Sequence, residues 1–235
     1  KIDKTFRDLF PFNRSLTGPG VDQTFEYLMA EFLPSANINS INSGTKVFDW
    51  EVPDEWNLTD AFVLNANGKK IIDINESNLH VVSYSTSVDK TVDAEELLKH
   101  LHYLPDKPHH IPYRTSYYEK NWGFCCTKKL IDSDDFIGPF RVVIDSQHDS
   151  NGKMKWLECV KYGNSNKEIL ISTYCCHPSL ANDNLSGIIL ASLLFNYLDS
   201  IPTKYTYRLV VLPETIGAIS FLANANINNI VGGMV

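Results

Sequence analysis

Three side chains suited to metal binding and acid–base chemistry follow two apolar segments of this 235-residue chain. His177 and Asp183 come after the apolar segment 168–174, and Glu214 comes after the apolar segment 205–212. An imidazole nitrogen and a carboxylate oxygen form a ligand pair that suits zinc. A further carboxylate that does not bind the metal can serve as a general base. These residue types therefore point to a metallohydrolase.

The elements around these residues are typical of an α/β protein. Each apolar segment has the length of a buried strand and precedes an apolar helical segment, 186–197 or 216–223. This order is typical of right-handed crossovers on a mainly parallel sheet. Open α/β sheets bind ligands at the carboxyl ends of their strands. We therefore expect a mainly parallel sheet flanked by helices, with His177, Asp183 and Glu214 in one crevice.

A different pattern occupies residues 44–131, where short strand-like segments alternate with turns. The dipeptide Asn67-Gly68 lies between two of these segments, 60–64 and 70–74. Asn-Gly favours a type I′ hairpin turn because both residues accept a positive φ. We interpret residues 44–131 as a smaller, β-rich inserted domain.

The α/β domain then comprises residues 1–43 and 132–235, and it includes further strands predicted at 140–144 and 155–162. The last segment, 230–235, has the pattern of a buried strand that is just beginning. An α/β domain does not normally end at such a strand. We therefore expect the domain to be incomplete at its C-terminal end.

Composition and charge exclude several classes of function. The net charge of −7 and the absence of a basic block argue against a nucleic-acid partner. No apolar run approaches the roughly 20 residues that span a bilayer, and the first residues lack a signal peptide's apolar core. The five cysteines follow neither a disulfide nor a zinc-ribbon pattern, which favours reduced thiols. We expect a cytoplasmic protein without a membrane partner. The sequence does not decide between a monomer and a homo-oligomer.

Cysteine and serine nucleophiles are disfavoured. Cys176 and His177 are adjacent, and neighbours on a strand point to opposite faces, so their side chains are expected to diverge. Ser186 lacks the preceding glycine of a nucleophile elbow.

The metal-site residues also have structural interpretations. Asp183 lies between two asparagines, where such residues favour a turn or a helix cap. Glu214 could occupy the first turn of a helix, where the dipole favours a carboxylate. Their joint placement with His177 at two strand ends nevertheless favours a metal site.

Three further residues are candidates for substrate binding. Arg14 lies near the start of the chain and could anchor a substrate carboxylate. Tyr113 and Arg114 belong to an aromatic segment that could line a ligand cleft. The alternative for this segment is that it packs the inserted domain against the α/β domain.

Two motifs resemble a known family. They are His-Pro-Ser-Leu-Ala-Asn-Asp-Asn-Leu-Ser-Gly at 177–187 and Leu-Pro-Glu-Thr-Ile-Gly at 212–217. They are similar to aminopeptidase-like proteins that are distant relatives of the co-catalytic zinc aminopeptidases. Further segments resemble the domain of unknown function inserted in those proteins, namely 48–57, 77–84, 112–118 and 122–124. The resemblance implies a phosphorylase/hydrolase-like α/β core with a β-rich insert, and some family members accompany enzymes of surface-polysaccharide biosynthesis.

The same resemblance implies roles for individual residues. His177 matches a zinc ligand, and Asp183 matches a metal ligand that bridges when two metals bind. Glu214 matches the catalytic glutamate of the aminopeptidase Glu-Glu pair. Thr215 replaces the second, metal-binding glutamate, and Pro178-Ser179 replaces the aspartate that follows the histidine. One zinc ion is thus implied, and the family's remaining aspartate and histidine ligands are expected after residue 235.

Two functions from different classes follow. The first is a zinc-dependent, aminopeptidase-like hydrolase that cleaves an amide bond in a peptide or an aminoacyl or sugar conjugate and is linked to surface-polysaccharide biosynthesis. The alternative is a catalytically silent module that binds a glycan or nucleotide-sugar, which the departures at Ser179 and Thr215 motivate. A purely structural partner protein is a third interpretation.

Overall fold

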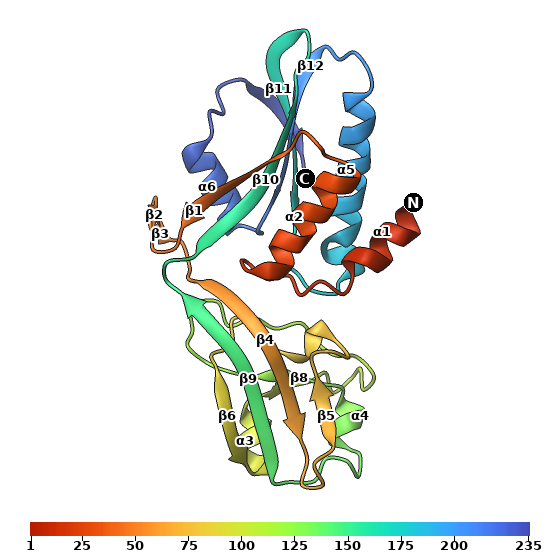
Figure 1. The fold of residues 1–235 in the computed structure, drawn as a ribbon, viewed down its shortest axis with the longest axis vertical. Helices are drawn as coiled ribbons and strands as arrows, with labels where there is room; N and C mark the ends of the chain where they lie inside the picture. The colour runs from red at the N-terminus through yellow and green to blue at the C-terminus, as the bar shows by residue number, and fades with distance from the viewer. The chain divides into compact units, whose positions relative to one another are not determined.

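A computed structural model describes residues 1–235, which form two compact units. The first unit comprises Lys1–Glu55 and Asp149–Val235, and the second comprises Trp56–His148 (Figure 1). The sequence-based boundaries at 44 and 131 therefore differ from the limits of these contact-based units.

A five-stranded sheet forms the centre of the first unit, in the order β1-β10-β12-β11-β13. β11 runs parallel to β12 and β13, whereas β10 runs antiparallel to β1 and β12. The sheet is thus mixed, and the expectation of a mainly parallel sheet was wrong. Only residues 162–164 connect β10 to β11, which is too short for a crossover helix, so the two strands run in opposite directions. The bounds are β1 Asn37–Asn42, β10 Lys153–Lys161, β11 Ser165–Tyr174, β12 Tyr205–Leu212 and β13 Ile230–Met234.

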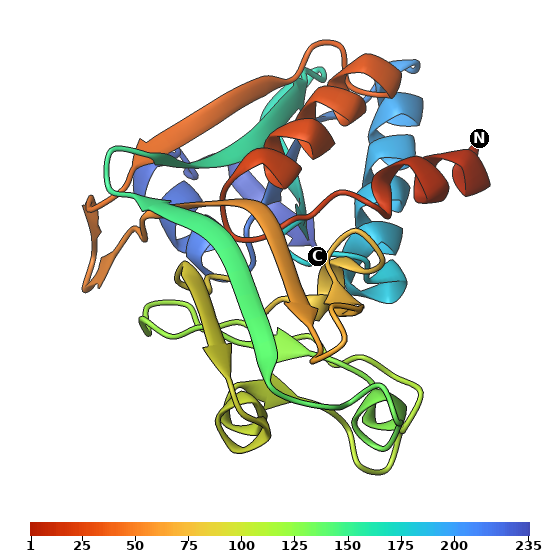
Figure 2. The same cartoon turned by 60° about the horizontal axis from the view of Figure 1, so that its bottom comes forward.

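Helices cover both faces of this sheet. α1 (Ile2–Leu9), α2 (Pro19–Glu31) and α5 (Ser186–Asp199) pack on one face, and Figures 1 and 2 both show them on the same side. α6 (Ile216–Asn224) packs on the other face.

Alternate residues of β12 face the two helical layers. Leu209 and Val211 belong to the core with α1, α2 and α5, whereas Val210 and Leu212 pack with Phe221 of α6. Burial on both faces explains why the strand has a continuous apolar sequence.

The second unit contains a four-stranded sheet in the order β5-β4-β9-β6. β4 pairs antiparallel with β5, and β9 pairs antiparallel with β6. β9 contains the segment 140–144, so this predicted strand of the α/β domain belongs to the other sheet. Its alternate burial at Phe140, Val142 and Ile144 is typical of a half-buried antiparallel strand. The bounds are β4 Glu55–Leu64, β5 Lys70–Asp73, β6 Val88–Val92 and β9 Phe140–Asp149.

The predicted hairpin between β4 and β5 is present, but its turn is not type I′. Gly68 has a φ of 74°, and Asn67 is not among the residues with a positive φ. The side chain of Asn65 accepts hydrogen bonds from the N–H groups of Asn67 and Lys69, so a longer loop closes the hairpin.

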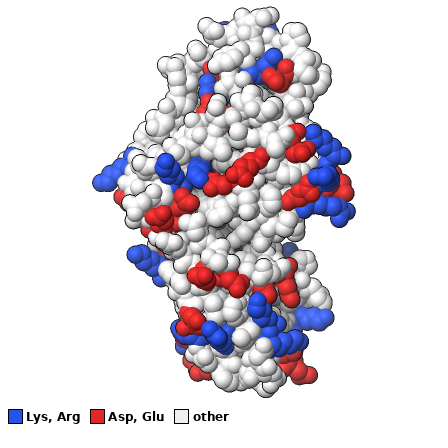
Figure 3. Space-filling view, viewed as in Figure 1, with Lys and Arg blue, Asp and Glu red and all other residues white.

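The remaining elements are short. They are β2 Lys46–Val47, β3 Trp50–Glu51, η1 Asn78–His80, α3 Ala94–Lys99, β7 Leu101–His102, β8 Phe124–Cys125, α4 Lys128–Ile131 and η2 Ala181–Leu185. Nowhere does a helix combine the length and apolar character that a bilayer crossing requires. On the face shown in Figure 3, Lys and Arg are interspersed with Asp and Glu and form no continuous basic surface.

Candidate functional site

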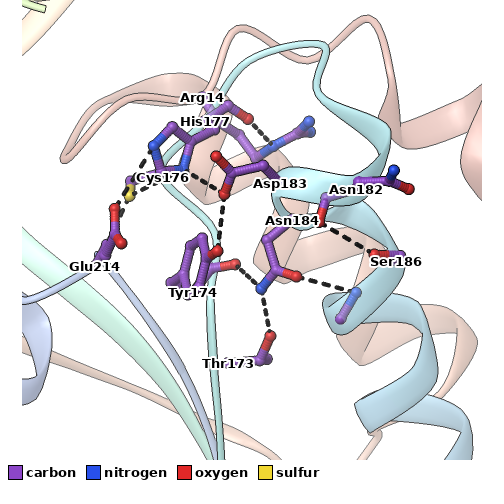
Figure 4. Close-up of polar contacts among 11 residues, drawn as sticks. Arg14, Thr173, Tyr174, Cys176, His177, Asn182, Asp183, Asn184, Ser186 and Glu214 are labelled. Carbon is purple, nitrogen blue, oxygen red and sulfur yellow. Dashed lines mark hydrogen bonds and ion pairs between the residues drawn. The ribbon is translucent and has the colours of Figure 1, made fainter. Parts of the chain in front are cut away.

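Two neighbouring strands position the three predicted site residues. β11 and β12 run parallel, and their last residues, Tyr174 and Leu212, are paired in the register. The loop after β11 carries His177 and Asp183, and the segment after β12 carries Glu214 (Figure 4). The strand ends therefore bring the three side chains to one edge of the sheet, as the sequence predicts.

The imidazole of His177 lies between the two carboxylates. Its Nδ1 is 3.8 Å from Asp183 Oδ1, and its Nε2 is 3.6 Å from Glu214 Oε2 (Figure 4). The side chain of His177 is only 8% exposed, whereas those of Asp183 and Glu214 are 54% and 47% exposed. The group thus combines a fixed, buried imidazole with carboxylates that solvent or a ligand can reach.

Tyr174 adds a polar group that sequence reasoning missed. Its hydroxyl donates a hydrogen bond to Asp183 Oδ1 at 2.8 Å, and its ring contacts the His177 ring edge-on at 5.6 Å between centroids. The hydrogen bond to Asp183, together with burial, raises the pKa of Tyr174 to about 12. The phenol therefore stays a hydrogen-bond donor at neutral pH. Its position at the end of the strand, three residues before His177, was the available signal.

Asn184 anchors the loop that carries Asp183. Its amide nitrogen donates to Thr173 Oγ1 at 2.8 Å and to the Tyr174 carbonyl at 3.1 Å, and its oxygen accepts from the Gly187 N–H. A Cβ at Gly187 would lie 2.2 Å from the Asn184 side-chain oxygen, so this contact requires glycine. The turn-and-cap interpretation thus holds for Asn184.

Cys176 lies behind the site and fixes the backbone of Glu214. Its sulfur accepts a hydrogen bond from the Glu214 N–H at 3.2 Å and lies 3.7 Å from His177 Nδ1. The predicted divergence of Cys176 and His177 was wrong, because both residues follow the end of β11 and the alternation of a strand does not apply. Burial raises the pKa of Cys176 to about 12, so the thiol is neutral at pH 7.

The residue after Glu214 adopts a strained conformation. Thr215 has φ 59° and ψ −67°, and the Ile216 N–H donates to the Glu214 carbonyl at 2.6 Å. These features define a γ-turn, which is rare and costly for a β-branched residue. The turn reverses the chain directly after Glu214 and leaves this residue outside α6, which begins at Ile216. The helix-turn interpretation of Glu214 therefore does not describe its position.

Arg14 lies beneath the His177 loop and not on an open surface. It is 1% exposed, and its Nε donates to the His177 carbonyl at 3.0 Å while Nη1 donates to the Leu9 carbonyl at 2.6 Å. Burial lowers the pKa of Arg14 to about 10. Because this value is still well above 7, the guanidinium is protonated at neutral pH. The guanidinium of Arg14 is therefore not exposed to a substrate in this structure, and the geometry does not support its interpretation as a substrate anchor.

The other two substrate-binding candidates belong to the second unit. Arg114 lines a cavity of about 140 Å³ there, with His102 and Trp122 among its neighbours. Tyr113 is half-buried in the same segment. Their role in substrate binding stays a prediction.

The sequence matches one protein family over residues 3–235, under the description "Domain of unknown function (DUF4910)". The chain belongs to the DUF4910 family. A relative from Clostridium acetobutylicum is 44% identical over 239 residues, which cover 100% of this chain and 54% of the relative. It carries the name "Putative polysaccharide biosynthesis protein with aminopeptidase-like domain". The chain therefore spans about half the length of this curated relative.

Solved structures confirm the aminopeptidase-like fold. The crystal structure of a "putative peptidase" from Clostridium acetobutylicum superposes with a TM-score of 0.93 and 44% identity, over 99% of this chain and 55% of that one. The zinc aminopeptidase BSAP from Bacillus subtilis has a TM-score of 0.59 at 9% identity, over 99% and 68% of the two chains. These matches confirm the family predicted from the two motifs.

The donor atoms of this DUF4910 chain fit a zinc ion. Nitrogen and oxygen ligands of tetrahedral zinc lie about 3.3–3.6 Å apart for bond lengths of about 2.0–2.2 Å. Nδ1 of His177 and Oδ1 of Asp183, at 3.8 Å, are within a few tenths of an ångström of this spacing. The 3.6 Å contact with Glu214 involves the other ring nitrogen, Nε2, so the two pairs do not share one zinc position. Cys176, His177 and Glu214 also offer one ligand atom each within 4.8 Å of one another. Binding through Cys176 would require loss of its thiol proton, because zinc binds the thiolate.

Proposed function

We propose that this chain is the aminopeptidase-like part of a zinc-dependent hydrolase that cleaves an amide bond in a peptide or aminoacyl conjugate. The observation that carries the proposal is the position of the His177 imidazole between the carboxylates of Asp183 and Glu214. The parallel pairing of β11 and β12 supports it, because ligands bind at the carboxyl ends of such strands.

His177 and Asp183 are the proposed zinc ligands. The bound ion would act as a Lewis acid and make water a better nucleophile at neutral pH. Oε2 of Glu214 lies 3.6 Å from Nε2 of His177, so this carboxylate lies beside the ring of the proposed ligand but outside the proposed ligand pair.

Glu214 is the proposed general base. Its carboxylate takes a proton from the attacking water as the new C–O bond forms, and passes that proton to the leaving nitrogen as the C–N bond breaks. The 47% exposure of the side chain allows it to reach a substrate, while Cys176 and the turn at Thr215 fix its backbone. One residue thus serves both proton transfers.

The name of the Clostridium relative supports a link to polysaccharide biosynthesis. We therefore propose a conjugate in which an aminoacyl or peptidyl group is joined by an amide to a sugar. Such a substrate reconciles an aminopeptidase-like site with that biosynthetic context.

The test is an activity assay on full-length protein with aminoacyl amides and aminoacylated amino sugars. Glu214→Gln keeps the size of the side chain and removes its basicity, and loss of a positioned acid–base group typically costs 10²–10⁴-fold in rate. Glu26→Gln, on the exposed face of α2, is the matched control. Equal activity of both variants and wild type would overturn the role of Glu214.

A second candidate function is a silent binding module. Thr215 favours it, because this residue cannot supply the carboxylate of a two-zinc site. The distinguishing measurement is binding of an amino-sugar glycan to His177→Ala after chelation. Retained binding, together with the absence of hydrolysis in wild type, would support this alternative.

A further inference from the structure

Arg14 is a buried cation with backbone partners only. Its guanidinium donates to the carbonyls of Leu9 and His177, and its third nitrogen, Nη2, is buried without a hydrogen-bond partner. No ion pair joins Arg14 to a carboxylate. Burying a charge in this way is unfavourable for folding, so packing alone does not account for the residue.

One of the two acceptors belongs to the proposed zinc ligand. The Arg14 Nε–His177 O contact, at 3.0 Å, holds the backbone from which the imidazole projects (Figure 4). The other acceptor, Leu9, is the last residue of α1. Arg14 therefore ties the end of a helix to the loop that follows β11.

A second contact joins the same two segments. The hydroxyl of Ser179 donates to the Phe10 carbonyl at 3.0 Å, two residues beyond His177. The Arg14 segment is itself fixed against α2, because a Cβ at Gly20 would lie 2.1 Å from the Asn13 carbonyl oxygen. The segment between α1 and α2 is thus held on one side by a helix and contacts the His177 loop on the other.

We propose that Arg14 is a positioning residue that fixes the backbone of His177 and thereby holds its imidazole between Asp183 and Glu214. An arginine suits this task because its planar guanidinium presents donors in fixed directions and can reach two carbonyls at once. A lysine presents a single ammonium on a flexible stem and lacks this fixed arrangement of donors. The role in zinc binding rests on the proposed function, whereas the role in ordering the imidazole does not.

The test uses three variants of the full-length protein. Arg14→Met removes the donors, and Arg14→Lys keeps the charge. Arg208→Met is the matched control, because Arg208 of β12 is also largely buried but pairs with Glu158 and Glu168. Circular dichroism verifies folding before each measurement, and thermal unfolding gives the loss of stability.

The first readout is the ring signal of His177 in a proton–carbon correlation spectrum without metal. The chain has seven histidines, and the signal missing from His177→Ala assigns this one. A shifted or broadened signal in Arg14→Met, partial recovery in Arg14→Lys and no change in Arg208→Met are expected. A signal that Arg14→Met leaves unchanged, or that both Met variants alter equally, would overturn the positioning role.

The second readout is the zinc dissociation constant, measured by competition with a chelator. Loss of a group that orients a metal ligand typically weakens metal affinity 10–100-fold, which is the expected effect of Arg14→Met. Arg208→Met is expected to keep the wild-type affinity. Absence of zinc binding in wild type would contradict the proposed function, and the ring signal would still decide the role of Arg14.

Discussion

The hydroxyl of Tyr174 donates a hydrogen bond to Oδ1 of Asp183 at 2.8 Å, so the last residue of β11 orients the carboxylate proposed to bind zinc. The same aromatic ring contacts the edge of His177. Tyr174 therefore touches both proposed ligands and is placed by the strand that precedes them. A metal ligand is commonly held by such a partner, which fixes its direction.

Tyr174→Phe is expected to weaken zinc binding by about 10–100-fold, because the ring stays in place and only the donor to Asp183 is lost. Chelator competition measures the effect. Tyr162→Phe is the control, because Tyr162 is 80% exposed. Equal affinities of the two variants would show that the Tyr174 hydroxyl does not support the ligand.

The ionisation of Tyr174 is expected at higher pH than that of an ordinary tyrosine. The hydrogen bond to Asp183, burial and the negative charge of that carboxylate all disfavour the phenolate and raise the pKa of Tyr174 to about 12. Because the folded-state pKa exceeds the unfolded value, this contribution to stability is present below about pH 10 and is lost as the pH rises toward 12. Ultraviolet titration of the metal-free protein and of Tyr174→Phe isolates this group. A difference curve centred near the usual tyrosine pKa would contradict the contact.

Arg208→Met is expected to destabilise the first unit by about 2–3 kcal/mol, because Glu158 and Glu168 would remain largely buried without their shared partner. Arg208 Nε lies 2.8 Å from Glu168 Oε2. Urea unfolding measures the loss. Arg141→Met, which removes an exposed ion pair with Asp89, should leave the unfolding curve unchanged. A smaller effect at Arg208 than at Arg141 would refute the prediction.

Thr215→Gly is expected to stabilise the protein by about 1 kcal/mol, because glycine accepts the positive φ that costs threonine about 1–3 kcal/mol. The same change is expected to lower activity, since Glu214 would be held less firmly. Unfolding and rate measurements on one sample test both effects. Thr203→Gly, at a residue without a positive φ, should not stabilise. Loss of stability in Thr215→Gly would argue against strain at this turn.

The sequence alone was sufficient to predict the convergence of His177, Asp183 and Glu214. Each follows an apolar strand, and the carboxyl ends of parallel neighbours must meet at one edge. The pairing of β9 could not be predicted in this way, because the pattern of Phe140, Val142 and Ile144 shows which face is buried but not which sheet supplies the partner strand.

The contacts around the site could not be predicted from the sequence either. Tyr174 and Arg14 act through partners that lie 9 and 163 residues away, respectively, and no local pattern encodes such distances. The direction of the Cys176 side chain was predicted from the alternation of a strand, but β11 ends at Tyr174, before this residue. The residue types at a strand end predict chemistry, whereas the groups that fix them require the fold.

Zinc content tests the central claim most directly. Elemental analysis of full-length protein, dialysed against trace zinc, is expected to give at least one stoichiometric zinc ion in wild type and in Glu214→Gln. His177→Ala and Asp183→Asn should each lose most of it, while the exposed-residue variant Glu26→Gln keeps it. No stoichiometric zinc in wild type, or full zinc content in His177→Ala, would contradict a metal site at the ends of β11 and β12.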